Sequence, residues 1–172
     1  MHVQESSMIP IKLQSIVDEI ESLMDDYNKY LDTQTGQVIC VSSEDFGIAE
    51  ESETGDDFSE YPDWQQTSIK QAMDVLLNCF SDKYIVLPTV HDINEYNIIE
   101  EFCGTVQNCQ IRDSLYTAIR GNGAFRRFKD AICRYGLEDS WYKFRNGALK
   151  QVAIKWCERN KILYLDDASG DK

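Results

Sequence analysis

The sequence has no long apolar run. Nothing in it approaches the ~20 consecutive apolar residues that a membrane-spanning helix requires. The opening residues, MHVQESSMIP, have neither the positive region nor the apolar region of a secretory signal peptide. We therefore expect a soluble, cytoplasmic protein with no membrane partner.

Histidine is scarce, and cysteine is not arranged for metal binding. The chain has two histidines, His2 and His91, and six cysteines without a single C-x-x-C pair. These patterns predict no metal site, no cofactor and reduced thiols, and they leave a Cys–His91 catalytic pair without a supporting motif. Four cysteines stand beside apolar residues and are predicted to be buried: Cys79, Cys103, Cys133 and Cys157.

The protein is acidic, but its charge is unevenly distributed. The 17 basic and 30 acidic residues give a net charge of −13. Residues 1–111 carry 22 acids and four bases, whereas residues 112–172 carry eight acids and 13 bases. The acidic whole disfavours nonspecific nucleic-acid binding, yet a local basic patch in the second part could act nearly independently.

A chain of 172 residues fits one domain, residues 1–172. Apolar spacings of three and four predict helices from Pro10 to about Tyr27 and over 64–80, 92–104, 108–120, 123–135 and 139–159. Strands are predicted within 28–42 as a hairpin turning at Gly36, over 83–88 and over 162–165. The predicted fold is α+β and mostly helical, with a small antiparallel sheet packed against a C-terminal helical array.

Two segments are predicted to be flexible. Residues 44–63 contain nine acids and no lysine or arginine, so self-repulsion favours a mobile acidic loop. Residues 166–172 follow the last strand as a polar tail.

The most distinctive stretch is RGNGAFRRFKDAICRYG, residues 120–136. On a helix from Gly123, Phe125 and Phe128 fall on the apolar face, which predicts that both are buried. Arg127, Asp130 and Arg134 are spaced for an ion-pair ladder. Gly121, Asn122 and Gly123 open the helix and could form an anion site at its N-terminus, although Gly121 also fits the end of the preceding helix.

Three functions remain open. The first is a non-enzymatic interaction or regulatory protein that binds another protein through a basic surface of the last two helices. The surface residues proposed for this contact are Arg126, Arg127, Lys129, Lys143 and Arg145. The alternatives are nucleic-acid binding by that surface, and an enzyme assembled from separated carboxylates such as Glu100, Glu101 and Asp130. No catalytic residue is assigned.

Several motifs together resemble a known family. They are YLDTQTG before a strand, YIVLPTV before HDINEY, then IEEF, RGNGAFRRFKD and WYKFRNGALKQVAIKWCERNKI, within residues 28–162. The chain resembles a bacterial family, uncharacterised protein family 0158. Because that family has no established activity, cofactor or catalytic residues, the resemblance supports a fold rather than a function.

Overall fold

The computed structural model describes residues 9–22 and 25–166, which form seven helices and five short strands. The fold is α+β and mostly helical, as predicted. The helices are α1 (Leu13–Glu21), α2 (Ser43–Glu51), α3 (Asp63–Leu77), α4 (Glu95–Thr105), α5 (Cys109–Ala118), α6 (Ala124–Arg134) and α7 (Glu138–Arg159). The strands are β1 (Ile11–Lys12), β2 (Tyr27–Asp32), β3 (Val38–Ser42), β4 (Tyr84–Val86) and β5 (Tyr164–Leu165). None of the described helices has both the length and the apolar character needed to cross a membrane.

The larger sheet is antiparallel and has the order β3-β2-β4. The β2–β3 hairpin turns where Gly36 adopts a φ of 72°, which confirms the predicted turn. Strand β4 is an edge strand rather than a fully buried one, because among the described strands it pairs only with β2, and it leaves Val86 53% exposed. Strand β5 was expected to join this sheet, but it does not. It pairs in parallel with β1, where the Ile11 N–H donates to the Leu163 carbonyl over 3.0 Å.

The first helix is shorter than its apolar spacing predicts. It begins at Leu13 after strand β1 and ends at Glu21, and Tyr27 already belongs to β2. Acidic residues cluster at its C-terminal end, where the helix dipole is also negative, so extension is disfavoured. The predicted helical residues 23 and 24 lie outside the described residues, as does tail segment 167–172.

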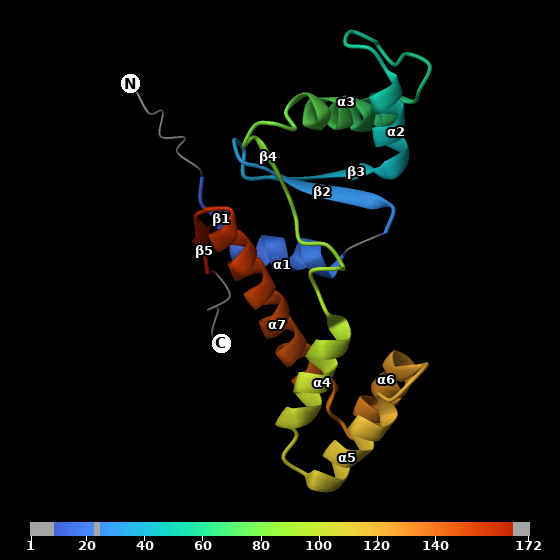
Figure 1. The fold of residues 1–172 in the computed structure, drawn as a ribbon, viewed down its shortest axis with the longest axis vertical. Helices are drawn as coiled ribbons and strands as arrows, with labels where there is room; N and C mark the ends of the chain where they lie inside the picture. The colour runs from blue at the N-terminus through green and yellow to red at the C-terminus, as the bar shows by residue number, and fades with distance from the viewer. Residues whose placement is uncertain (1–8, 23–24, 167–172) are drawn as a thin grey trace.

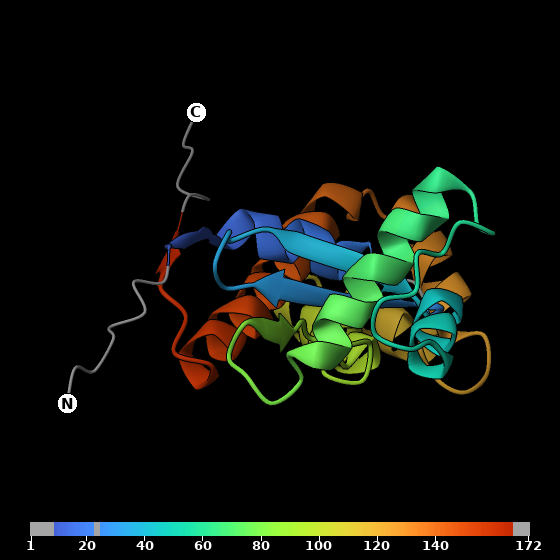
Figure 2. The ribbon, with the colours of Figure 1, turned by 90° about the horizontal axis from the view of Figure 1, so that it is seen from above.

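Helices cover both faces of the antiparallel sheet. Figure 1 shows α2 and α3 on one side and α1 with α7 on the other, while Figure 2 shows α3 crossing over the strands. One buried cluster lies between the sheet and helices α1 and α4–α7, and it includes Leu31 of β2 with Phe128 and Trp141. A smaller cluster lies between β3, α2 and α3 and includes Val41 and Ile69. The sheet therefore packs against the helical array through one face only.

The acidic segment is not a loop throughout. Residues Ser43–Glu51 form α2, and Ser42 caps it by accepting a hydrogen bond from the Asp45 N–H at 3.1 Å. The carboxylate of Asp45, only 4% exposed, accepts from Ser68 Oγ at 2.6 Å and Gln65 Nε2 at 3.2 Å. Burial alone would raise the pKa of Asp45, but hydrogen bonds from Ser68, Ser42 and Gln65 lower it below its ordinary value. These bonds, together with the favourable interaction of acids with a helix N-terminus, outweigh the self-repulsion. Asp63 begins α3, so mobility remains a prediction for residues 52–62 alone.

Burial of the cysteines follows helix geometry rather than sequence neighbours. Cys103 and Cys157 are buried as predicted, and burial raises the pKa of each thiol to about 11. Cys79 and Cys133 are exposed, contrary to the prediction. Adjacent residues on a helix point in different directions, so Cys133 faces solvent although Ile132 is buried.

Candidate functional site

The residues of the predicted basic surface do not all lie on one face of α6. Arg127 lies on the side of α6 that packs against α5. Its guanidinium donates from Nε to the Ala118 carbonyl at 2.8 Å, from Nη1 to the Asn122 carbonyl at 2.5 Å and from Nη2 to the Arg120 carbonyl. These acceptors belong to the end of α5 and the loop that follows it. Arg127 therefore closes the α5–α6 connection instead of serving as an available cation.

This arrangement changes the interpretation of the glycine-opened loop. Gly121 and Gly123 have φ values of 71° and 78°, and a side chain at Gly123 would place its Cβ 3.1 Å from Nη1 of Arg127. The loop turns two carbonyls towards the guanidinium of Arg127. The two glycines are therefore explained by this turn, without a ligand. The anion site at Gly121, Asn122 and Gly123 remains a prediction. Among the described residues no ion pair links Arg127, Asp130 and Arg134, so the predicted ladder is wrong.

Arg145 is also held within the fold. Its Nε donates to Glu95 of α4 at 2.6 Å, and its Nη1 contacts Glu21 of α1 at 3.2 Å. One side chain of α7 thus ties two other helices together. Because two carboxylates share this single cation, Arg145 adds no excess positive charge to the surface.

The remaining three cations of the predicted surface are different. Arg126, Lys129 and Lys143 are exposed. No hydrogen bond or ion pair joins them to another residue in ranges 9–22 and 25–166. Their charges are therefore available to a partner.

A pocket of about 230 Å³ includes Lys129, one of these three cations, in its lining, and we call it the α6–α7 pocket. Its lining residues come from α4, α6 and α7, and they are Glu95, Ile99, Phe125, Phe128, Lys129, Ile132, Trp141, Tyr142 and Arg145. The floor is buried and rigid: the Phe128 and Trp141 rings meet edge to face with centroids 4.8 Å apart. Two aromatic residues at the pocket, Phe125 and Tyr142, are 49% and 62% exposed.

The exposure of Phe125 corrects the prediction that both phenylalanines are buried. Phe128 lies near the centre of the apolar arc of α6 and is buried, whereas Phe125 lies about 60° further round the helix, at the margin of that arc. The prediction treated every position on the apolar face as equally buried, so it did not distinguish the centre of the face from its margin. Tyr142 was not predicted as a site residue, although it follows Trp141 and so had to point away from the core on the same helix.

The carboxylates considered for an enzyme do not converge. Asp130 lines a different pocket, with Arg127 and Arg134, to which neither Glu100 nor Glu101 contributes. Glu101 instead accepts a hydrogen bond from Asn97 at 2.9 Å on its own helix. Within the described part of the chain, no group of three or more His, Cys, Asp and Glu side chains is arranged to hold a metal ion.

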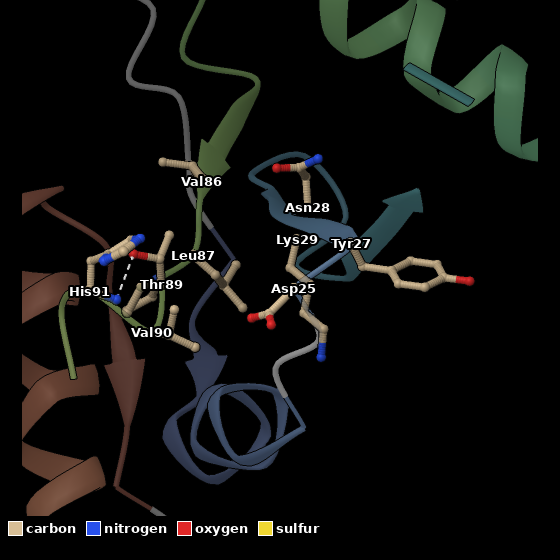
Figure 3. A pocket seen from close by; sticks show the side chains of 10 residues that line it. Asp25, Tyr27, Asn28, Lys29, Val86, Leu87, Thr89, Val90 and His91 are labelled. Atoms are coloured by element: carbon tan, nitrogen blue, oxygen red, sulfur yellow. Dashed lines mark hydrogen bonds between the residues drawn. The ribbon is translucent and has the colours of Figure 1, made fainter. Parts of the chain in front are cut away.

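A further hollow, of about 360 Å³, lies between the Asp25–Lys29 and Val86–His91 segments (Figure 3). Lys29 contributes to its wall, but its ammonium is bonded elsewhere, to the side chains of Glu19 at 2.7 Å and Ser22 at 2.8 Å and to both of their carbonyls. Asp25 and His91 are exposed, and no hydrogen bond joins them among the described residues. The hollow therefore lacks an assembled acid–base pair.

Comparison with known proteins identifies the family. Residues 60–170 match the model of Uncharacterised protein family (UPF0158). The chain is also similar to UPF0158 protein PA5073 of Pseudomonas aeruginosa, with 22% identity over 149 residues, which cover 85% of this chain and 82% of the relative. No solved structure matches. The matched region contains α3 to α7, and hence the α6–α7 pocket, and the chain belongs to the uncharacterised protein family UPF0158.

Proposed function

We propose that the protein is a non-enzymatic cytoplasmic interaction protein that binds a short acidic segment of another protein in the α6–α7 pocket. One observation supports this proposal above the others. The pocket combines a buried apolar floor, two exposed aromatic rings and a lysine, Lys129, that makes no ion pair with a described residue.

The size of the pocket favours a side chain as its occupant. Drug-sized ligands occupy pockets of about 300–1,000 Å³. At about 230 Å³ the α6–α7 pocket is smaller, and it suits one large apolar side chain of a partner. Protein interfaces are commonly dominated by such an anchor, and aromatic residues are enriched around it. Phe125 and Tyr142 supply that aromatic surface here.

The charges favour an acidic partner of limited extent. Arg126, Lys129 and Lys143 are available, whereas Arg145 is shared between Glu21 and Glu95. The two carboxylates outnumber the one guanidinium and disfavour an extended phosphate backbone next to the pocket. A peptide with one or two acids beside an apolar anchor can contact the outer cations and avoid these carboxylates.

A displayed peptide library tests the proposal directly. Selection on the wild-type protein should enrich peptides that join an aromatic or aliphatic residue to acidic ones. Affinity for a synthesised winner should fall about tenfold or more in Phe125→Ala and in Lys129→Glu, because each loses a central contact. Arg134→Glu is the matched control, since it makes the same charge change on the opposite side of α6 and should bind normally.

If no peptide is enriched, or if the winners bind Phe125→Ala and Lys129→Glu as tightly as wild type, the pocket is not the binding site. Circular dichroism of each variant shows whether the protein keeps its helix content.

Nucleic-acid binding is the second candidate. It is favoured by the exposure of Phe125, which lies in the first turn of α6 next to Arg126. A base could stack on this ring while Arg126 and Lys129 contact phosphates. Fluorescence anisotropy with a labelled single strand and a duplex at low salt measures it. If oligonucleotide binding weakens as salt is raised, and also weakens in the double variant Arg126→Ala/Lys129→Ala, the result would support nucleic acid in place of a peptide.

A further inference from the structure

A second pocket lies at the opposite end of α7, where the helix meets the exit of β4. Its volume is about 400 Å³, and its principal walls are Val86, Pro88, Val152, Lys155, Trp156 and Arg159. It shares no lining residue with the α6–α7 pocket. Tyr142 and Lys155 are 13 positions apart on one helix, which corresponds to about 20 Å. We call it the α7–β4 pocket, and any ligand in it is independent of the function proposed above.

The apolar wall of the α7–β4 pocket is rigidly positioned. The Trp156 side chain is 6% exposed, and its indole Nε1–H donates to the Val86 carbonyl at 2.9 Å. This bond fixes the ring and satisfies an edge carbonyl of β4. Pro88 and Val152 complete an apolar wall that can hold a flat or aliphatic group.

Two cations, Lys155 and Arg159, border this wall. Lys155 and Arg159 are one helical turn apart, both are exposed, and neither makes an ion pair with another residue of the described chain. The pocket also contains Asp92, but its Oδ2 already accepts from the N–H and the hydroxyl of Thr89 at 2.7 and 3.1 Å. With Lys155 and Arg159 against the single carboxylate of Asp92, the pocket keeps a net positive charge for an anion.

A purely structural role for these cations would be to bond the free carbonyls at the end of α7. Those carbonyls have other partners. The Trp156 carbonyl accepts from the backbone N–H and side-chain amide of Asn160 at 3.1 and 2.8 Å. The next two accept from backbone N–H groups, that of Cys157 from Ile162 and that of Glu158 from Lys161. The helix end is closed without Lys155 or Arg159.

We propose that the α7–β4 pocket binds a small organic anion whose apolar body lies against Trp156 and whose carboxylate or phosphate is held by Lys155 and Arg159. The guanidinium of Arg159 can donate two parallel hydrogen bonds to either group, and the ammonium of Lys155 adds a second charge. A volume of about 400 Å³ lies within the range of small-molecule sites.

Two-dimensional ¹H–¹⁵N NMR of the full chain tests this proposal through the indole N–H of Trp156, which can be assigned by its proximity to Val86. The probes are benzoate, phenyl phosphate, benzyl alcohol and inorganic phosphate. Benzoate or phenyl phosphate should shift the Trp156 signal saturably, and the stronger of the two identifies the preferred anionic group. Benzyl alcohol and inorganic phosphate should bind at least about tenfold more weakly, because each lacks half of the required chemistry.

Variants separate this site from nonspecific attraction. Lys155→Ala with Arg159→Ala should weaken the better probe about tenfold or more. Lys155→Gln with Arg159→Gln keeps the side-chain stems and should do the same if the alanine pair unfolds. Arg126→Ala with Lys143→Ala removes two cations elsewhere and should leave binding unchanged. An unmoved Trp156 signal, equal binding of inorganic phosphate, or equal losses in the control pair would overturn the proposal.

Discussion

The sheet side and the helical side of the molecule use their charged residues differently. On the sheet side, formed by β2, β3, β4, α2 and α3, two of the three lysines, Lys29 and Lys83, are bonded to neighbours in the fold, and Lys70 is the one without an ion pair to a described residue. Asp45 binds two side chains, and the Asp74 carboxylate accepts from Lys83 at 2.6 Å and from the Tyr84 hydroxyl. On the helical side, α4 to α7, Arg127 and Arg145 are bonded in the same way.

Three other cations of the helical side make no hydrogen bond or ion pair with a described residue. Arg126, Lys129 and Lys143 lie on the same two helices as the bonded arginines but contact no described acid. Neighbouring residues of identical chemistry can therefore have opposite roles. A basic run in a sequence locates a charged region, whereas bonding within the fold decides which charges are available.

The largest effect is expected at Lys29, whose side chain connects β2 to the end of α1. Lys29→Ala removes an ammonium that is 8% exposed and leaves four oxygen acceptors of Glu19 and Ser22 without it. Chemical denaturation should show a loss of about 2–4 kcal/mol in the free energy of unfolding. Lys70→Ala, at an exposed lysine of α3, is the control and should change it by less than about 0.5 kcal/mol. Equal effects would remove the distinction between bonded and available charge.

The next largest effect is expected at Asp45, which joins α2 to α3. Asp45→Asn should lower the free energy of unfolding by about 1–2 kcal/mol at pH 6, because the ionised carboxylate accepts strong hydrogen bonds that an amide cannot fully replace.

The same variant gives a pH test with a defined sign. The pKa of Asp45 is lowered in the folded protein, so its contribution is present above the unfolded pKa of about 3.9 and is lost as pH falls through the folded value. The stability difference between wild type and Asp45→Asn should therefore shrink below about pH 4. A difference that stays constant between pH 6 and pH 3 would show that the bonds do not favour the charged form.

A smaller effect is expected at Arg145, which the sequence placed on the binding surface. Arg145→Ala should cost about 1 kcal/mol of unfolding free energy, because it breaks the contacts of α7 with Glu21 and Glu95 in a partly exposed site. Lys143→Ala, two positions away, should cost less than about 0.5 kcal/mol. Thermal unfolding of the pair at low and high salt measures this, and a loss confined to Lys143→Ala would reverse the assignment.

Most of the fold could be predicted from local signals. The spacing of apolar residues placed α3 to α7, and Gly36 marked a turn that requires positive φ. The pairing of strands far apart in the sequence could not be predicted in the same way. Whether residues 162–165 join the larger sheet depends on where α7 ends relative to Ile11. The acidic segment was misread because the sequence does not show that Ser68 and Gln65 of a later helix bond Asp45.

The candidate site could be predicted only in part. The sequence identified α6 and α7 and three cations that prove to be available, Arg126, Lys129 and Lys143. It could not separate Arg127 and Arg145 from these, because their acceptors lie on other segments: carbonyls of residues 118–122 and carboxylates of α1 and α4. Nor could helical phase settle the exposure of Phe125, since a margin position is buried or exposed according to its neighbours.

The adjacent arginines of α6 provide the most direct test of this division between bonded and available charge. Chemical denaturation of Arg127→Ala should show a loss of about 1 kcal/mol, because three backbone carbonyls lose their donor at an exposed site. The same measurement on Arg126→Ala should agree with wild type within about 0.5 kcal/mol. Equal losses in the two variants, or a larger loss in Arg126→Ala, would contradict the account.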